Sequence, residues 1–174
     1  MKNKNISIRL GLALMASLFS VSVGASVTSD TVFTATIGQP SCSITAPASV
    51  DLGELNPVSV RPFPSFNITV NCAGTISTRL WAKAKNGVLT PSSRGVYLEV
   101  DGKVPSPEKA TEFYISSGYI TQLDLSGRGE TDPALTFCSG DTNRVCLLKP
   151  ALNASKNAEL GNGTVTITFN LQHQ

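Results

Sequence analysis

The segment ELGNGTVTITFNLQHQ, residues 159–174, contains the clearest strand pattern in the sequence. Apolar residues recur there at every second position, and threonine and asparagine fill the positions between them. The apolar positions are Val165, Ile167, Phe169 and Leu171. Strict alternation of this kind predicts a β-strand with one buried face and one exposed face. Because chain ends fray unless other parts hold them, this strand is expected to pair with something.

Residues 1–25 have the pattern of a secretory signal peptide. Three basic residues are followed by an apolar run and then by the small residues Val23, Gly24 and Ala25. We therefore expect cleavage after Ala25, so that the exported chain begins at Ser26. A membrane anchor is the alternative, but the apolar run is short for a bilayer. Cleavage removes three positive charges and no negative one, so the net charge of +2 becomes slightly negative.

All four cysteines lie in the part of the chain that we expect to be exported, at Cys42, Cys72, Cys138 and Cys146. An even number of cysteines in an exported protein predicts disulfides, and three pairings are open. Local pairing of Cys138 with Cys146, across a segment rich in turn residues, is the simplest and leaves Cys42 with Cys72. A four-thiolate metal site is the rival interpretation, but the spacings lack two CxxC pairs.

The rest of the exported chain has the pattern of short strands separated by turn residues. Alternating or apolar runs predict strands within 27–37, 66–72, 79–85, 96–100, 111–116, 119–125 and 144–150, and 42–55 is expected to be extended. Asp101–Gly102 is a strong hairpin signal, and Ser106–Pro107 favours one short helical turn. Several short strands at regular spacing, in a chain of 174 residues, predict an all-β sandwich.

The residue inventory argues against an enzyme. The single histidine, His173, lies next to the C-terminus, where a catalytic triad is hard to assemble. Asp51 and Glu54 are close in sequence, but charged residues in turns are usually solvated and nothing marks these two as an acid–base pair. The sequence has no phosphate-binding glycine loop and no zinc motif, and no basic patch indicates nucleic acid as a partner.

Three features of the exported chain occur together. A loosely alternating segment precedes Cys42, and the sequence SITAPASVDLGEL follows it. A second cysteine, Cys72, ends the run FNITVNC. The alternating strand near the C-terminus has Gly161 upstream, fourteenth from the end. Together these features resemble the subunits of chaperone–usher pili, the type 1 pilin-like fimbrial proteins of Gram-negative bacteria.

This resemblance implies an incomplete immunoglobulin-like β-sandwich that lacks its last strand and is completed by a donor strand. A periplasmic chaperone first fills the resulting groove, and the N-terminal extension of the next subunit later replaces it. The implied division is a signal peptide at 1–25, a donor-strand extension at 26–41 and a pilin domain at 42–174. The residues implied for the acceptor groove and chaperone recognition are Gly161, Val165, Ile167, Phe169, Leu171, His173 and Gln174. His173 stands where the family usually has an aromatic residue.

The same resemblance assigns a face to the N-terminal extension. Counting every second residue back from Cys42 gives the side chains that would enter a neighbour's groove: Val27, Ser29, Thr31, Phe33, Ala35 and Ile37. The family has a small residue at one of these places, and Ala35 stands there. A disordered tail is the alternative for this segment.

The function implied is that of a structural subunit, major or minor, of a pilus that attaches bacteria to surfaces, with no catalysis and no cofactor. Its partners would be a periplasmic chaperone, an outer-membrane usher and neighbouring subunits, and it would be exported through the periplasm to the bacterial surface. A single-domain adhesin that binds a host receptor is the alternative. The pair Cys138–Cys146 lies outside the family's common single-disulfide pattern, and we expect it to staple a hairpin or loop near the last strand.

Overall fold

The run FNITVNC folds as β3, Phe66–Cys72, and its alternating side chains divide between the core and the solvent as predicted. Ile68 and Val70 are buried, whereas Asn67 and Asn71 are exposed. The computed structural model describes residues 41–54 and 60–174, within the unit Gly38–Gln174. The predicted signal peptide and the face of the N-terminal extension lie outside the described residues.

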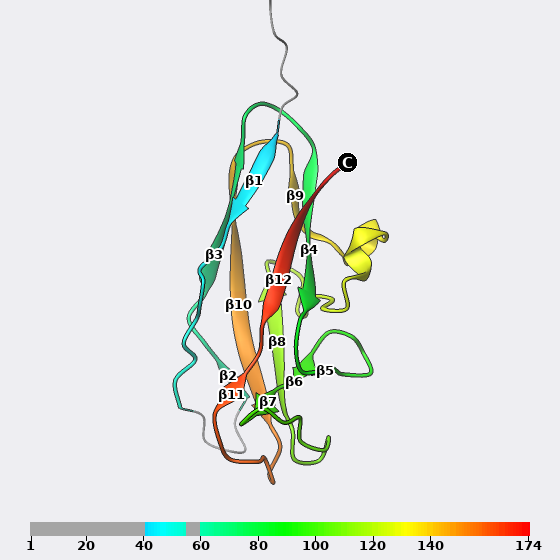
Figure 1. Cartoon of the computed structure of the whole chain (residues 1–174). Coiled ribbons are helices and arrows are strands. Elements are labelled where there is room, and N and C mark those ends of the chain that lie inside the picture. The colour runs from blue at the N-terminus through cyan, green and yellow to red at the C-terminus, as the bar shows by residue number, and fades with distance from the viewer. Residues whose placement is uncertain (1–40, 55–59) are drawn as a thin grey trace, which may run out of the picture. The chain divides into compact units, whose positions relative to one another are not determined.

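The larger sheet is built around β3 and the long central strand β10, Arg144–Ala154 (Figure 1). Its order is β1-β3-β10-β8-β6-β5, and β2 pairs with the far end of β10. The other strands of this sheet are β1 (Cys42–Thr45), β2 (Val60–Pro62), β5 (Val88–Leu89), β6 (Val96–Tyr97) and β8 (Thr111–Ser117). Every pairing within it is antiparallel.

The smaller sheet has the order β12-β4-β9 and contains the strand predicted at the C-terminus. Its members are β4 (Thr78–Ala84), β9 (Phe137–Gly140) and β12 (Ile167–His173). β11 (Gly163–Thr164), which lies immediately before β12 along the chain, pairs with β7 (Glu99–Val100). Figure 1 shows β12 passing in front of the larger sheet, with β4 beside it.

The core lies between the two sheets and is filled by the inward positions of the alternating strands. Ile68, Leu80, Ile115, Leu125 and Leu148 are among its fully buried side chains. Burial of each such side chain contributes roughly 1.5–3 kcal/mol relative to exposure. No helix in the described part of the chain is long and apolar enough to cross a membrane. The short 3-10 helices η1 (Arg128–Glu130) and η2 (Pro133–Leu135) lie beside β4.

Three local predictions need correction. The expected strand 96–100 is interrupted at Leu98, because β6 pairs with β8 whereas β7 pairs with β11. The expected helical turn at 106–109 is only a turn, closed by a hydrogen bond from Lys109 N to Ser106 O. It cannot continue as a helix, because Ala110 is buried in the core and β8 starts at Thr111. The hairpin turn at Asp101–Gly102 is confirmed, with φ of 48° and 78°, as a two-residue type I′ connection requires.

Residues 119–125 form a loop rather than the expected strand. A tight turn joins Ser117 to Ile120, and the chain then leaves the edge of β8. Leu123 and Leu125 are buried and attach the loop to the core, with their N–H groups donating to Ile115 and Ser93. The alternation in this stretch therefore arises because Leu123 and Leu125 enter the core and hold the loop against it.

Candidate functional site at the edge of the last strand

The last strand, β12, is an edge strand within the described residues, because it pairs along its length with β4 alone. One backbone hydrogen bond lies just beyond each end of this pairing. Lys85 N donates to Thr166 O at 2.8 Å, and Gln174 N donates to Ser77 O at 2.9 Å. Backbone groups alternate in direction along a strand. The N–H and C=O groups of Ile167, Phe169, Leu171 and His173 therefore point away from β4, toward the open edge.

The side chains of these residues make the edge apolar as well as unpaired. Val165, Ile167, Phe169 and Leu171 pack against the buried core but remain partly exposed. Phe169 lies between the sheets, with its ring centroid 6.2 Å from that of Phe66 and 6.2 Å from that of Phe137. The same residues thus offer an apolar face and free backbone hydrogen-bonding groups.

A second open edge faces this one, on β1. Ala73 N donates to Ser41 O at 2.9 Å, so the backbone groups of alternate residues point toward β3. The backbone N–H and C=O groups of Cys42 and Ile44 consequently point away from β3. The side chains of both residues are partly buried against the core. Some Cα atoms of β1 and β12 lie within 8 Å of each other, yet no strand pairing joins them in the described part of the chain.

The segment before β12 is held by a close approach at Gly161. Gly161 has a φ of +150°, and a Cβ added there would lie 2.6 Å from Val100 Cγ1. Asn162 O accepts from the Asp101 N–H at 3.1 Å, and the Asn162 N–H donates to the Asp101 carboxylate at 3.2 Å. Glycine at this position lets β11 turn tightly onto β7 and start β12 in register.

The opposite end of β12 is held by polar side chains. Gln172 Oε1 accepts from Arg79 Nε at 3.1 Å, and Gln172 Nε2 donates to Glu130 O at 3.0 Å. His173 and Gln174 are exposed, although the backbone N–H of Gln174 is bonded to Ser77. The strand therefore remains ordered by its contacts with β4 and η1 while its outer edge stays open.

Both cysteine pairs are those predicted, Cys42–Cys72 and Cys138–Cys146. Cys42 and Cys72 face each other across β1 and β3, with Cα atoms 4.0 Å apart. The second pair joins β9 of the smaller sheet to β10 of the larger one. The expectation of a staple on a loop near the last strand is therefore refined, because this disulfide connects the two sheets.

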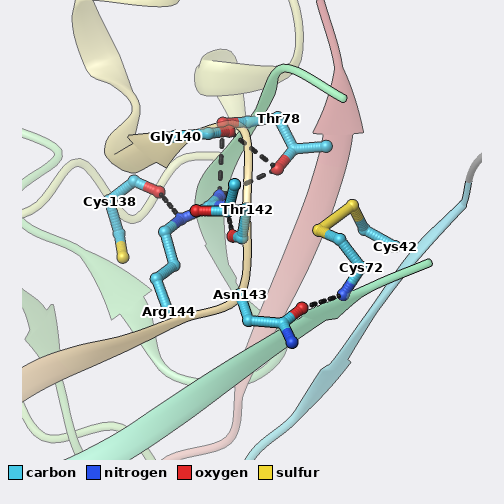
Figure 2. Close-up of a disulfide and its surroundings, with 8 residues drawn as sticks. All are labelled: Cys42, Cys72, Thr78, Cys138, Gly140, Thr142, Asn143 and Arg144. Carbon is cyan, nitrogen blue, oxygen red and sulfur yellow. Dashed lines mark hydrogen bonds between the residues drawn. A yellow bond between two sulfur atoms is a disulfide. The ribbon is translucent and has the colours of Figure 1, made fainter. Parts of the chain in front are cut away.

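Residues 143 and 144, where the turn after β9 enters β10, bond to Cys72 of one disulfide and to Cys138 of the other (Figure 2). Asn143 Oδ1 accepts from Cys72 N at 2.6 Å. The Arg144 guanidinium donates to Cys138 O at 2.8 Å, to Thr142 O at 3.2 Å and to Thr78 Oγ1 at 2.9 Å. Burial lowers the pKa of Arg144, but hydrogen bonds to these oxygens satisfy the guanidinium. This network ties the ends of β1, β3, β4 and β10 together.

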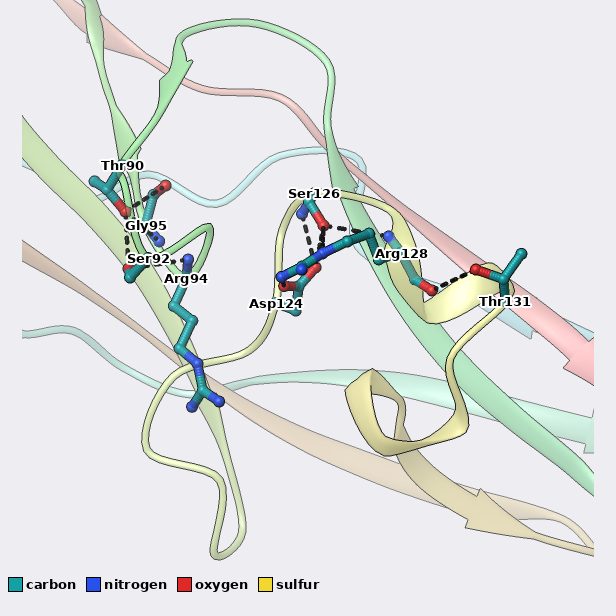
Figure 3. Close-up of polar contacts among 8 residues, drawn as sticks. All are labelled: Thr90, Ser92, Arg94, Gly95, Asp124, Ser126, Arg128 and Thr131. Atoms are coloured by element: carbon teal, nitrogen blue, oxygen red, sulfur yellow. Dashed lines mark hydrogen bonds and ion pairs between the residues drawn. The ribbon is translucent and has the colours of Figure 1, made fainter.

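A buried carboxylate holds the loop that covers β4 (Figure 3). The side chain of Asp124 is 3% exposed and accepts from the Ser126 hydroxyl, from Ser126 N at 3.0 Å and from Arg128 Nη2 at 2.7 Å. Burial raises the pKa of Asp124, but the hydrogen bonds from Ser126 and Arg128 together outweigh it, so the pKa lies below its ordinary value. This cluster has the character of a structural clamp.

The structure brings some of the predicted site residues together and leaves others aside. Val165, Ile167, Phe169 and Leu171 line one edge, whereas Gly161 lies in the turn before it. Cys42 was expected only as a disulfide partner and Phe66 only on an inward face, and nothing indicated that Cys42 and Ile44 face the edge of β12 or that Phe66 lies near Phe169. The alternation within CSIT was the available signal for β1, but four residues are too few to indicate what lies across from them.

No group of three or more acidic, cysteine or histidine residues suited to a metal ion occurs in 41–54 and 60–174. No protein-family model matches the chain, and a search of curated proteins finds no match. Solved structures do resemble it. The P pilus rod subunit PapA is 16% identical with a TM-score of 0.55, and the match covers 76% of this chain and 99% of that one.

A chaperone–usher pilus structure gives a similar result, with 16% identity and a TM-score of 0.55 over 84% of this chain and 96% of that one. At this level of identity the likeness concerns the fold. It agrees with the two packed antiparallel sheets described above. The chain therefore folds as an all-β, immunoglobulin-like sandwich of the pilin type.

Proposed function

We propose that this chain is a structural subunit, major or minor, of a chaperone–usher pilus and that it polymerises by donor-strand exchange. The observation that carries the proposal is the open edge of β12, where Ile167, Phe169 and Leu171 expose both apolar side chains and backbone hydrogen-bonding groups. An edge of this kind is a template for another strand. The facing edge of β1 also has free backbone groups, but some of its Cα atoms lie within 8 Å of β12. A strand paired on both sides needs about 9.6 Å between its neighbours, so full insertion would require β1 to move aside.

The strand that fills this edge comes from a neighbouring copy of the chain, from the residues that precede its β1. Residues 26–41 would belong to the exported chain, and an extended conformation would place Phe33, Ala35 and Ile37 on one face of that segment. Burying Phe33 and Ile37 against a neighbour would contribute roughly 1.5–3 kcal/mol each. A periplasmic chaperone would cover the same edge before assembly, an usher would export the subunit, and the pilus would carry it on the bacterial surface.

Strand exchange in vitro tests this function. The chaperone-bound mature chain is mixed with synthetic peptides covering residues 26–40, and release of the chaperone is followed by size exclusion. We expect the native peptide and the Thr34→Val peptide to exchange, because Thr34 faces away. The Phe33→Ser peptide should exchange poorly, and an Ala35→Leu peptide should clash at a cost of about 1–3 kcal/mol.

Two results would contradict the proposal. The first is equal exchange by the Phe33→Ser and Thr34→Val peptides, which would show that the assigned face is wrong. The second is a mature chain that folds cooperatively as a stable monomer with no chaperone and no peptide, since the apolar edge would then need no partner.

One observation favours the adhesin as a second candidate. An open hollow of about 680 Å³ lies beside the disulfide Cys138–Cys146 and is lined by Tyr119, Val145, Leu147 and Lys149, among others. Tyr119, which is fully exposed, and its neighbouring hydroxyl groups are suited to contact a receptor on a host surface. A glycan array probed with the chaperone-bound chain tests this, with Tyr119→Ala as the matched variant. Binding that the variant abolishes would favour the adhesin.

A further inference from the structure

We infer that a second copy of this chain docks end to end against the loops that precede β12, and that exposed Leu160 and Val104 form the apolar centre of this contact. The inference rests on the proposed donor-strand exchange. It adds a contact between the folded bodies of successive subunits, beyond the exchanged strand itself.

Leu160 and Val104 lie at the same end of the sandwich. Leu160 is 78% exposed and precedes Gly161, which approaches Val100 and Asp101 closely. Val104 is 36% exposed and follows the turn closed by the hydrogen bonds between Val100 and Lys103. Figure 1 shows the connected strands β7 and β11 at this end, opposite the end at which β1 begins. We call it the β11 end.

The opposite end holds the start of the described chain. Ser41 accepts from Ala73 N, and Gln174 N donates to Ser77 O, so the beginning of β1 and the end of β12 lie together with residues 73–77. The turn at 73–75 is exposed. We call this the β1 end, and it is where a donor's N-terminal extension leaves its own body.

The direction of the inserted strand decides which ends meet. Every strand pairing in the described residues is antiparallel, and antiparallel pairing is slightly more stable than parallel. β12 offers the longer edge, Ile167–His173, against Cys42–Thr45 on β1. A strand antiparallel to β12 places residue 37 of the donor at the β11 end of the acceptor.

Chain length then brings the two bodies into contact. Residues 27–37 span about 36 Å when extended, which matches the run from β11 to the end of β12. Only residues 38–40 separate this strand from Ser41, so four Cα–Cα steps join residue 37 to Ser41 and span at most about 14 Å. This short connection brings the donor's β1 end, with its turn at 73–75, close to the acceptor's β11 end, with Leu160 and Val104.

The test compares two donors for one acceptor, a peptide of residues 26–40 and the whole mature chain, starting from chaperone-bound protein. In acceptors with Leu160→Ser and Val104→Ser, the peptide complex should dissociate at the normal rate. The complex between whole subunits should dissociate about tenfold faster, because only it buries these side chains. Leu147→Ser is the control, since Leu147 is 49% exposed on the outer face of β10.

Unchanged dissociation of whole subunits with normal peptide binding overturns the inference and leaves the proposed function standing. Failure of the peptide to enter overturns both. A photo-crosslinking amino acid at position 160 should capture residues 73–75 of the neighbouring copy. Capture of those residues by the same group at position 174 instead would show parallel insertion and would also overturn the inference.

Discussion

Asp124 is the residue whose chemistry depends most on the folded state, because its carboxylate is buried and fully hydrogen-bonded. Its folded pKa lies below the ordinary value, so its contribution to stability is present at neutral pH. That contribution is lost as the pH falls below about 4 and through the folded pKa. We expect Asp124→Asn to lower the free energy of unfolding by about 1–3 kcal/mol at pH 7 and by less at pH 3.

Urea unfolding of the peptide-complemented chain at the two pH values measures this difference. Glu130→Gln is the control, because Glu130 is exposed in the same loop and its side chain has no described hydrogen bond in this clamp. An Asp124→Asn variant that loses the same stability at both pH values would contradict a role for the ionised carboxylate.

At the scale of one element, β12 has two kinds of backbone N–H group. That of His173 points to the open edge, whereas that of Gln172 points to β4. Proline has no N–H group and therefore separates the two roles. We expect His173→Pro to leave the fold intact and to weaken peptide binding, whereas Gln172→Pro should lower the stability of the folded chain.

Circular dichroism melting of the chaperone-free, peptide-complemented chain reports stability, and peptide exchange reports the edge. Equal effects of the two substitutions on both measurements would show that the open edge of β12 does not take part in pairing. The side chain of His173 is exposed, so its removal is not expected to disturb the core.

At the scale of the whole molecule, the disulfides constrain different parts of the sandwich. Cys138–Cys146 joins the two sheets, and Cys42–Cys72 joins neighbouring strands of one sheet. In the chain-entropy model these loops contribute about 3 and about 4 kcal/mol respectively. We expect replacement of each pair by two serines to lower the free energy of unfolding by about these amounts, measured by denaturant unfolding with donor peptide bound.

A smaller loss for the pair Cys42–Cys72 than for Cys138–Cys146 would contradict the unfolded-state explanation. Such a result would indicate instead that Cys138–Cys146 stabilises the chain mainly through packing in the folded state. Peptide affinity of the two double variants is the second readout, since Cys42 also borders the open edge of β1.

Features that depend on neighbouring residues could be predicted from the amino-acid sequence. Alternation placed Ile68, Val70, Leu80 and Phe169 on inward faces, and the Asp101–Gly102 pair specified a turn with positive φ. Of the three disulfide pairings that were open, local spacing favoured the one that the structure has. These features were predictable because side-chain direction in a strand and turn geometry are local properties.

Which strands become neighbours could not be predicted from local sequence and was seen only in the folded chain. The structure showed that β12 pairs with β4, that β1 stands across from it, and that the expected strand 96–100 is divided between two pairings at Leu98. It also buried Asp124 in a loop that had the pattern of a strand. Such contacts join residues far apart in the chain, and packing of the whole sandwich selects among pairings that local sequence leaves equally favourable.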